Sequence, residues 1–146
     1  MKNPMRTFAL LMVALFWVNA CAHLTSNPAN KETLKTSVEK VWDAKLNGDW
    51  GVVYDIAVKE YKKKMKKTTF LKRANVVVKE YDIKDIKILE PGKKAISVVG
   101  YKIVQAGFEF NISRFKEEWL WEEGAWHLNL LPTLNSPIIE QKSQQQ

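Results

Sequence analysis

The sequence predicts an α+β domain in which N-terminal helices pack across a curved, four-stranded antiparallel sheet. Two patterns carry this prediction. Before residue 75, apolar residues recur every three or four positions, as they do along one face of a helix. After residue 85, apolar and polar residues alternate in segments separated by turn signals, which is typical of strands joined by hairpins. Helices followed by such a meander belong to the α+β class.

The first helix is expected over 31–46, with Asn30 as its N-cap and Asn47-Gly48 as its stop. Its apolar stripe consists of Leu34, Val38, Val41, Trp42 and Leu46. A second helix begins after Asp49, and its stripe consists of residues spaced four apart: Val53, Ala57, Tyr61 and Met65. Thr68 or Thr69 then caps a short third helix, which contains Phe70, Leu71 and Ala74.

Four strands follow, and turn signals separate them. The first contains Ile86 and Ile88 and ends at the turn Glu90-Pro91-Gly92-Lys93. The second runs from Ala95 to Val104 and ends at the turn Ala106-Gly107. Glu123-Gly124 joins the third strand to the fourth, and the apolar residues of the fourth strand alternate: Trp126, Leu128 and Leu130.

The third strand changes its parity. One set of alternating residues is Phe108, Phe110 and Ile112, and the opposite parity is taken by Phe115, Trp119 and Trp121. A β-bulge adds one residue to one strand of a pair and bends that strand. We therefore predict a bulge near Ser113-Arg114 that bends this long strand.

The start of the chain is typical of an export signal. Lys2 and Arg6 precede a short apolar run, and small Ala20 precedes Cys21, the single cysteine of the chain. The layout resembles a bacterial lipoprotein signal, which implies that residues 1–20 are removed and that Cys21 is lipidated. An ordinary signal peptidase would instead release a soluble protein that begins at Cys21. One unpaired cysteine in an exported chain favours lipidation.

The rest of the chain divides into three parts. Residues 21–30 read as a lipidated polar tether, residues 31–131 as one domain, and residues 132–146 as a polar, disordered tail. Ala22 stands where some bacteria place the Asp that retains lipoproteins in the inner membrane. The resemblance therefore implies anchoring in the outer membrane, facing the periplasm.

The predicted domain resembles the nuclear transport factor two-like superfamily, which includes SnoaL-like and ketosteroid isomerase-like proteins. It is similar in particular to small bacterial lipoproteins of unknown function in that superfamily. The motifs that carry the resemblance are Gly48-Asp49-Trp50, the order Tyr54, Tyr61, Phe70-Leu71, and the ending Trp119, Gly124, Trp126. The resemblance implies a cone-shaped, cystatin-like roll whose mouth holds a small apolar ligand. It also implies a homodimer, because several members pair through the outer face of the sheet.

Six aromatic residues are expected to line the cone, and they are Trp42, Tyr54, Tyr61, Phe70, Trp119 and Trp126. If these side chains fill the cone, they form an ordinary core; if they leave it open, they form a ligand pocket. The favoured function is a binding or accessory module for a small apolar ligand or an envelope partner. A soluble, exported interaction scaffold is one alternative.

An enzyme is the other alternative, because isomerases and dehydratases of the superfamily place an acid or base inside the cone. Glu117 shares the parity of Trp119, and it would be the acid or base if that face lines the cone. The favoured interpretation of Glu117 is a cross-strand partner of Lys or Arg on the convex face. We expect Asp55 to form a salt bridge on its helix and His127 to face the outer surface.

Eight basic residues crowd into 59–73 against one acid, Glu60, and they are Lys59, Lys62, Lys63, Lys64, Lys66, Lys67, Lys72 and Arg73. They could contact anionic headgroups or an acidic envelope protein, or they could be a solvated helix end. Nucleic acid is not the expected partner, since the export signal removes the chain from it and no recognition motif accompanies the charge. No cluster of metal-ligating residues and no glycine-rich phosphate loop occurs in the sequence, so neither a metal nor a cofactor is predicted.

Overall fold

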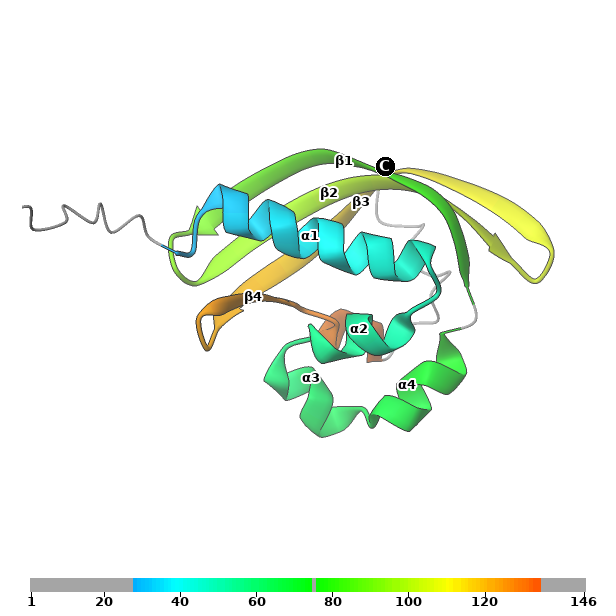
Figure 1. Ribbon diagram of the computed structural model, residues 1–146, viewed down its shortest axis with the longest axis horizontal. Helices are drawn as coiled ribbons and strands as arrows, with labels where there is room; N and C mark the ends of the chain where they lie inside the picture. Colours follow the sequence, from blue (N-terminus) through cyan, green and yellow to red (C-terminus); the bar gives the residue numbers. More distant parts are fainter. Residues whose placement is uncertain (1–27, 75, 135–146) are drawn as a thin grey trace, which may run out of the picture.

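Four helices precede a four-stranded antiparallel sheet in the computed structural model, which describes residues 28–74 and 76–134 (Figure 1). The helices are α1 (Lys31–Leu46), α2 (Trp50–Asp55), α3 (Lys59–Lys64) and α4 (Lys67–Arg73). The strands are β1 (Val77–Glu90), β2 (Lys94–Gln105), β3 (Phe108–Glu122) and β4 (Ala125–Leu128), and a 3-10 helix, η2 (Leu131–Leu134), follows them. The predicted α+β class is confirmed, and Figure 1 shows α1 lying across the concave side of the curved sheet.

Helix α1 begins and ends where the sequence predicts. The Asn30 side chain accepts a hydrogen bond from the Thr33 N–H at 2.9 Å, and Thr33 Oγ1 accepts one from the Asn30 N–H, which completes a capping box. The buried stripe differs at one position. Leu46 is 40 % exposed, and Ala44 is buried instead. Leu46 is the last residue of the helix.

The predicted second helix is wrong as a single element, because the chain breaks between α2 and α3. At the break, the Val58 N–H donates to the Leu128 carbonyl at 3.0 Å, and the Leu128 N–H donates to the Ile56 carbonyl at 3.1 Å. The Ile56 carbonyl and the Val58 N–H thus bond to β4, whereas the N–H groups of Ile56 and Ala57 still bond back to α2. Ala57 is nevertheless fully buried, as its stripe predicts. Helix α4 begins after Lys66 without a side-chain cap, so the predicted threonine caps are also wrong.

The sheet has the order β1-β2-β3-β4, and the predicted bulge in β3 is confirmed. Val99 pairs with Phe115, but Tyr101 pairs with Ile112, so Ser113-Arg114 lies opposite the single residue Gly100. With the bulge, Phe110 on one side and Phe115 on the other both pack against the core, whereas Phe108 at the start of the strand is 69 % exposed. Gly100 is needed there, since a Cβ would lie 3.0 Å from the Ser113 carbonyl oxygen.

Two hydrophobic clusters hold the fold together. The larger lies between α1 and the sheet and includes the fully buried residues Leu34, Val38, Val41, Val99 and Trp119. The smaller lies among α2, α3 and α4, and its buried residues are Tyr54, Ala57, Val58, Tyr61 and Met65. None of the helices in the described part is long and apolar enough to cross a membrane.

The folded part extends beyond the predicted domain limits at both ends. Ala29, which the sequence assigns to the tether, is 4 % exposed and belongs to the larger cluster. Residues 131–134 form η2, and Leu131 and Leu134 pack against the smaller cluster, so the predicted tail begins three residues too early. The predicted signal peptide and Cys21 lie outside the described residues.

Candidate functional site

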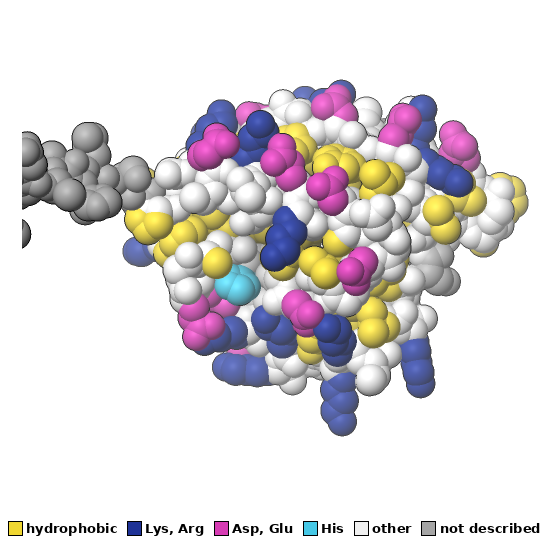
Figure 2. Space-filling model, in the orientation of Figure 1, with side chains coloured by type: hydrophobic (Ala, Val, Ile, Leu, Met, Phe, Trp, Pro, Cys, Tyr) yellow, Lys and Arg dark blue, Asp and Glu magenta, His cyan; other side chains and the backbone are white. Residues whose placement is uncertain are grey.

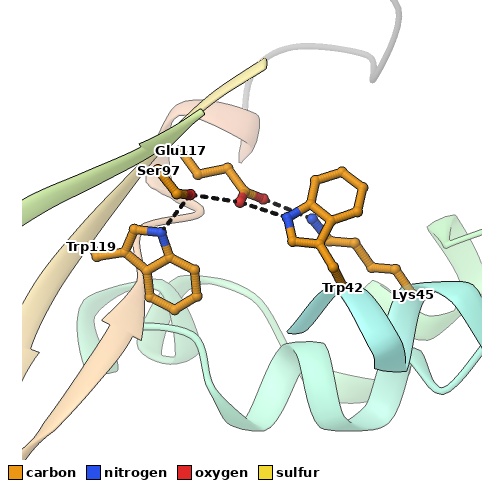
Figure 3. A network of polar contacts seen from close by, with 5 residues as sticks. All are labelled: Trp42, Lys45, Ser97, Glu117 and Trp119. Atoms are coloured by element: carbon orange, nitrogen blue, oxygen red, sulfur yellow. Dashed lines mark hydrogen bonds and ion pairs between the residues drawn. The ribbon is translucent and has the colours of Figure 1, made fainter. Parts of the chain in front are cut away.

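A buried carboxylate joins α1 to the sheet. Glu117 on β3 is 5 % exposed, and its Oε2 accepts hydrogen bonds from Trp42 Nε1 at 2.8 Å and from Ser97 Oγ at 3.2 Å (Figure 3). Its Oε1 pairs with Lys45 Nζ at 2.8 Å. One anion on β3 therefore holds an indole and an ammonium group from α1 and a hydroxyl from β2.

The partners of Glu117 are themselves engaged. Trp119 Nε1 donates to Ser97 Oγ at 3.0 Å, and the Ser97 hydroxyl passes a hydrogen bond on to the carboxylate (Figure 3). The Lys45 ammonium lies 3.8 Å from the centre of the Trp42 ring, a cation–π distance. The buried negative charge is thus matched by a positive charge and by two donors, as burial requires.

The favoured prediction that Glu117 lies on the convex face is wrong. The bulge at Ser113-Arg114 brings Glu117 to the concave face, beneath α1. Lys45 and Ser97 were not singled out from the sequence. The one signal for Lys45 is its spacing, since it follows Trp42 by three residues and shares a helical face with it.

An open cavity of about 280 Å³ lies beside this network. Its wall is mostly apolar and includes Trp42, Trp50, Phe70, Tyr101, Phe115 and Leu130. Two of the six predicted lining residues, Trp42 and Phe70, border it. The other four lie elsewhere: Tyr54 and Tyr61 pack in the smaller cluster, and Trp119 and Trp126 pack in the larger one. The aromatic residues fill much of the interior without closing it.

Polar groups border the cavity on the side of β3. Glu118 pairs with Lys94 at 2.5 Å and accepts a hydrogen bond from Asn129 Nδ2 at 2.8 Å. Burial alone would raise the pKa of Glu118, but Lys94 and Asn129 outweigh it and hold that pKa below its ordinary value. The Lys116 side chain is exposed and forms no ion pair or hydrogen bond with any described residue, and its positive charge also helps to lower the pKa of Glu118.

Tyr101 borders the same cavity from β2. Burial, helped by the negative charge of Glu117, raises the pKa of its phenol to about 12. Its ring lies 4.8 Å from the ring of Trp42 and 5.6 Å from that of Phe115, centre to centre. Its hydroxyl has no hydrogen-bond partner among the described residues. Tyr101 thus combines a fixed ring with an unused donor.

The other two acid–base candidates lie away from the cavity lining. Asp55 is exposed on α2 and forms the expected salt bridge, with Lys67 at 2.7 Å. His127 is half-buried on β4, opposite Leu120, and its buried Nδ1 has no partner among the described residues. The structure does not bring Asp55, His127 and Glu117 together at the cavity. Within the described ranges, no group of three or more His, Cys, Asp or Glu residues could hold a metal ion.

The eight basic residues of 59–73, here called the basic edge, lie on and beside α3 and α4. Figure 2 shows Lys and Arg side chains extending from this part of the surface, with a few acidic groups among them. Five of the eight are engaged: Lys59 pairs with Glu123, Lys63 and Lys64 with Glu60, Lys67 with Asp55, and Lys62 bonds the Asp55 carbonyl. Within the described residues, the side chains of Lys66, Lys72 and Arg73 form no ion pair or hydrogen bond.

Comparison with known proteins identifies the architecture and no more. No protein-family model matches the sequence, and no curated protein gives a significant match. Among solved structures, the chain is similar to a SEC-C motif containing protein from Rhodopseudomonas palustris, with a TM-score of 0.52 and 10 % sequence identity. The match covers 71 % of this chain and 77 % of that one. At this identity the likeness shows a shared α+β fold alone.

Proposed function

We propose that this protein is a lipid-anchored bacterial envelope protein whose folded domain is a binding module for a small apolar ligand. The observation that carries the proposal is the open, mostly apolar cavity of about 280 Å³. Ligand sites are concave and mostly apolar, with a few placed polar groups, and their volumes begin at about 300 Å³. In this proposal the domain is a cone-shaped member of the nuclear transport factor two-like superfamily, and the cavity is the mouth of the cone.

The state of Glu117 favours binding over catalysis. A general base must reach the proton that it removes with a free lone pair. Here the two oxygens of Glu117 already face Trp42, Ser97 and Lys45, and the side chain is 3 % exposed. The enzyme alternative would have to break this network before Glu117 could act, whereas a binding module uses it as a rigid wall.

The anchor in this proposal is Cys21, acylated after removal of residues 1–20, in the outer membrane and facing the periplasm. The described fold begins at Pro28, so six residues separate it from Cys21. Fully extended, six residues span at most about 20 Å. The basic edge then works close to a bilayer, where each cation beside anionic headgroups contributes about 1 kcal/mol.

Native mass spectrometry of residues 22–146 tests the binding function. This segment contains every described element, and all described hydrogen bonds and core contacts lie within residues 28–134. We expect a retained or added small apolar molecule, for example decanol, to appear bound to one copy of the chain. A chain that stays bare at saturating decanol would refute the binding function. If that chain is also a dimer, the interaction scaffold becomes the better proposal.

The anchor has an independent test in the full chain. Wild-type protein should carry an acyl mass and sediment with membranes, and Cys21→Ala should lose both properties. Ala22→Ser, one residue further along, should keep both and serves as the control. A wild-type chain without an acyl group would refute the anchor and leave the cavity proposal untouched.

The basic edge is tested on residues 22–146, so that no acyl chain contributes. Replacing Lys66, Lys72 and Arg73 by glutamine should weaken flotation with anionic vesicles roughly a hundredfold. The matched control replaces three exposed lysines elsewhere, Lys31, Lys40 and Lys87, with the same change in net charge. Equal losses for both triple variants would mean that overall charge, and not this surface, attracts the protein to the bilayer.

A further inference from the structure

The charged side chains on the cavity side of the sheet cancel one another. Four charged residues border the cavity, and they are Lys45, Lys116, Glu117 and Glu118. Side chains alternate along β3, so Lys116 and Glu118 point to the face opposite that of Glu117. The remaining two, Lys45 and Glu117, form an ion pair at 2.8 Å (Figure 3). Because burying an unmatched charge is costly, this cavity favours an uncharged ligand.

Two hydrogen-bond donors at the cavity lack a partner. The Tyr101 hydroxyl and the Trp50 indole N–H belong to lining residues, and neither forms a hydrogen bond with any described residue. Neither atom is among the buried polar atoms that lack a partner, so both are accessible. By contrast, Asn129 Nδ2 and Thr133 Oγ1 already donate to other groups of the chain. The cavity therefore offers uncharged donors to a ligand that brings an acceptor.

Of these two donors, the Tyr101 hydroxyl is held in place by neighbouring rings. Tyr101 shares the concave face of β2 with Val99 and Ile103, which are buried in the larger cluster. Its ring packs against those of Trp42 and Phe115 at 4.8 and 5.6 Å, centre to centre. The pKa of this phenol is about 12, so it keeps its proton at neutral pH. A donor that is already fixed costs little further entropy when a ligand binds.

We propose that the cavity binds a small, uncharged apolar molecule with one hydrogen-bond acceptor, to which the Tyr101 hydroxyl donates. This inference rests on the proposed function and names the ligand class. The apolar part of the ligand lies against the aromatic wall that includes Trp50, Phe70 and Phe115. Ring–ring contacts with such a wall add to the free energy gained by apolar burial, so aromatic probes suit the test.

The size of the cavity selects the probes. Its volume of about 280 Å³ equals the liquid volume of about nine water molecules, so a molecule of roughly nine non-hydrogen atoms fits within it. Acetophenone, isopropylbenzene and benzoate all have this size and nearly the same branched shape. They differ in one group, which is an uncharged acceptor in acetophenone, a methyl group in isopropylbenzene and a carboxylate in benzoate.

Titration calorimetry of residues 22–146 with the three probes tests the proposal. Each probe is compared between wild type and Tyr101→Phe, so that its own hydration does not affect the comparison. We expect Tyr101→Phe to weaken acetophenone binding roughly 3- to 10-fold, as one neutral hydrogen bond predicts, and to leave isopropylbenzene binding unchanged. Wild type should bind benzoate at least roughly tenfold more weakly than acetophenone, because the carboxylate would be buried without a matching charge.

A matched control and a second measurement locate the hydrogen bond. The Tyr81 hydroxyl donates to Asp43 at 2.6 Å, and Tyr81 is not part of the cavity lining. Tyr81→Phe should therefore leave the affinity for all three probes unchanged. Infrared spectra of bound acetophenone should show its carbonyl stretch at a lower frequency in wild type than in Tyr101→Phe, because a hydrogen bond weakens the C=O bond.

The outcomes separate the ligand class from the binding function. An unchanged acetophenone affinity in Tyr101→Phe, or an equal loss for acetophenone and isopropylbenzene, would overturn the role of the hydroxyl. Benzoate bound as tightly as acetophenone would overturn the uncharged class. A chain that binds decanol but none of the three probes would also refute this ligand class and leave the binding module intact. A chain that binds neither decanol nor these probes would refute both proposals.

Discussion

Replacing Lys45 by methionine should destabilise the fold, because the buried carboxylate of Glu117 would lose its cation. In the wild type, Lys45 and Glu117 lie 2.8 Å apart, with side chains that are 11 % and 3 % exposed. Methionine fills the space of the lysine stem but leaves Glu117 with two neutral donors and no cation. Breaking one side of a buried pair costs about 3 kcal/mol, a large part of the total stability of a domain of this size.

A double-mutant cycle separates this charge effect from packing. Glu117→Gln removes the negative charge and keeps an acceptor for the Trp42 indole. The double variant Lys45→Met/Glu117→Gln contains no charge at this position. Its loss of unfolding free energy should therefore be at least about 2 kcal/mol smaller than the sum of the losses in the two single variants. The matched control is Lys35–Glu39 on the same helix, an exposed pair at 3.7 Å, for which about 0.3 kcal/mol is expected.

Urea unfolding of residues 22–146, followed by tryptophan fluorescence, measures both cycles. Added salt should weaken the coupling of the exposed pair and leave that of Lys45 and Glu117 almost unchanged, because little solvent reaches the buried pair. Similar m-values in all variants would show that the unfolded state is unchanged. A coupling no larger than that of Lys35–Glu39 would refute the reasoning, since it would mean that the charge of Glu117 does not depend on Lys45.

Three further predictions concern the frame of the site. Gly100→Ala should cost about 2 kcal/mol in urea unfolding, because its Cβ would lie 3.0 Å from the Ser113 carbonyl oxygen; a loss below about 0.5 kcal/mol would show that the bulge yields easily. Asn30→Ala should cost about 1 kcal/mol and Asn30→Gly only a few tenths, and equal losses would mean that the cap hydrogen bond is not the cause. The folded pKa of Tyr101, about 12, lies above its unfolded value near 10, so its contribution to stability is complete below pH 10 and is lost as the pH rises to 12. The unfolding free energy of wild type should therefore fall relative to that of Tyr101→Phe over that range, and a difference that stays constant would contradict the assignment.

The sequence predicted the elements well where local pattern decides them. Period, caps and turn residues place α1 and the hairpins, and the change of parity in β3 is visible in the positions of its aromatic residues. The break at Ala57 escaped prediction because its cause lies in β4: Leu128 offers the backbone groups that replace those of a continuing helix. Competition of this kind is non-local and leaves no trace in the periodicity.

The candidate site was only partly predictable. The parity of Glu117 makes it a candidate in the sequence, but its partners are not predictable from that parity, because the bulge places it on the concave face beneath α1. Lys45 reads as an ordinary surface lysine in the sequence, and only the depth at which α1 lies against the sheet makes it a partner. The aromatic residues in the sequence predict a core, but they do not predict where in that core a cavity remains.

The hydrogen bonds between residues 56–58 and Leu128 also bear on how the chain folds. They close a loop of about 70 residues, so the hinge between α2 and α3 gains its partners only after β4 is in place. Closing so long a loop costs conformational entropy and is slow, so these hydrogen bonds form late in folding. Until β4 forms, the segment between α2 and α3 lacks both of these hydrogen bonds, so its break from a continuous helix is fixed by the last strand of the sheet.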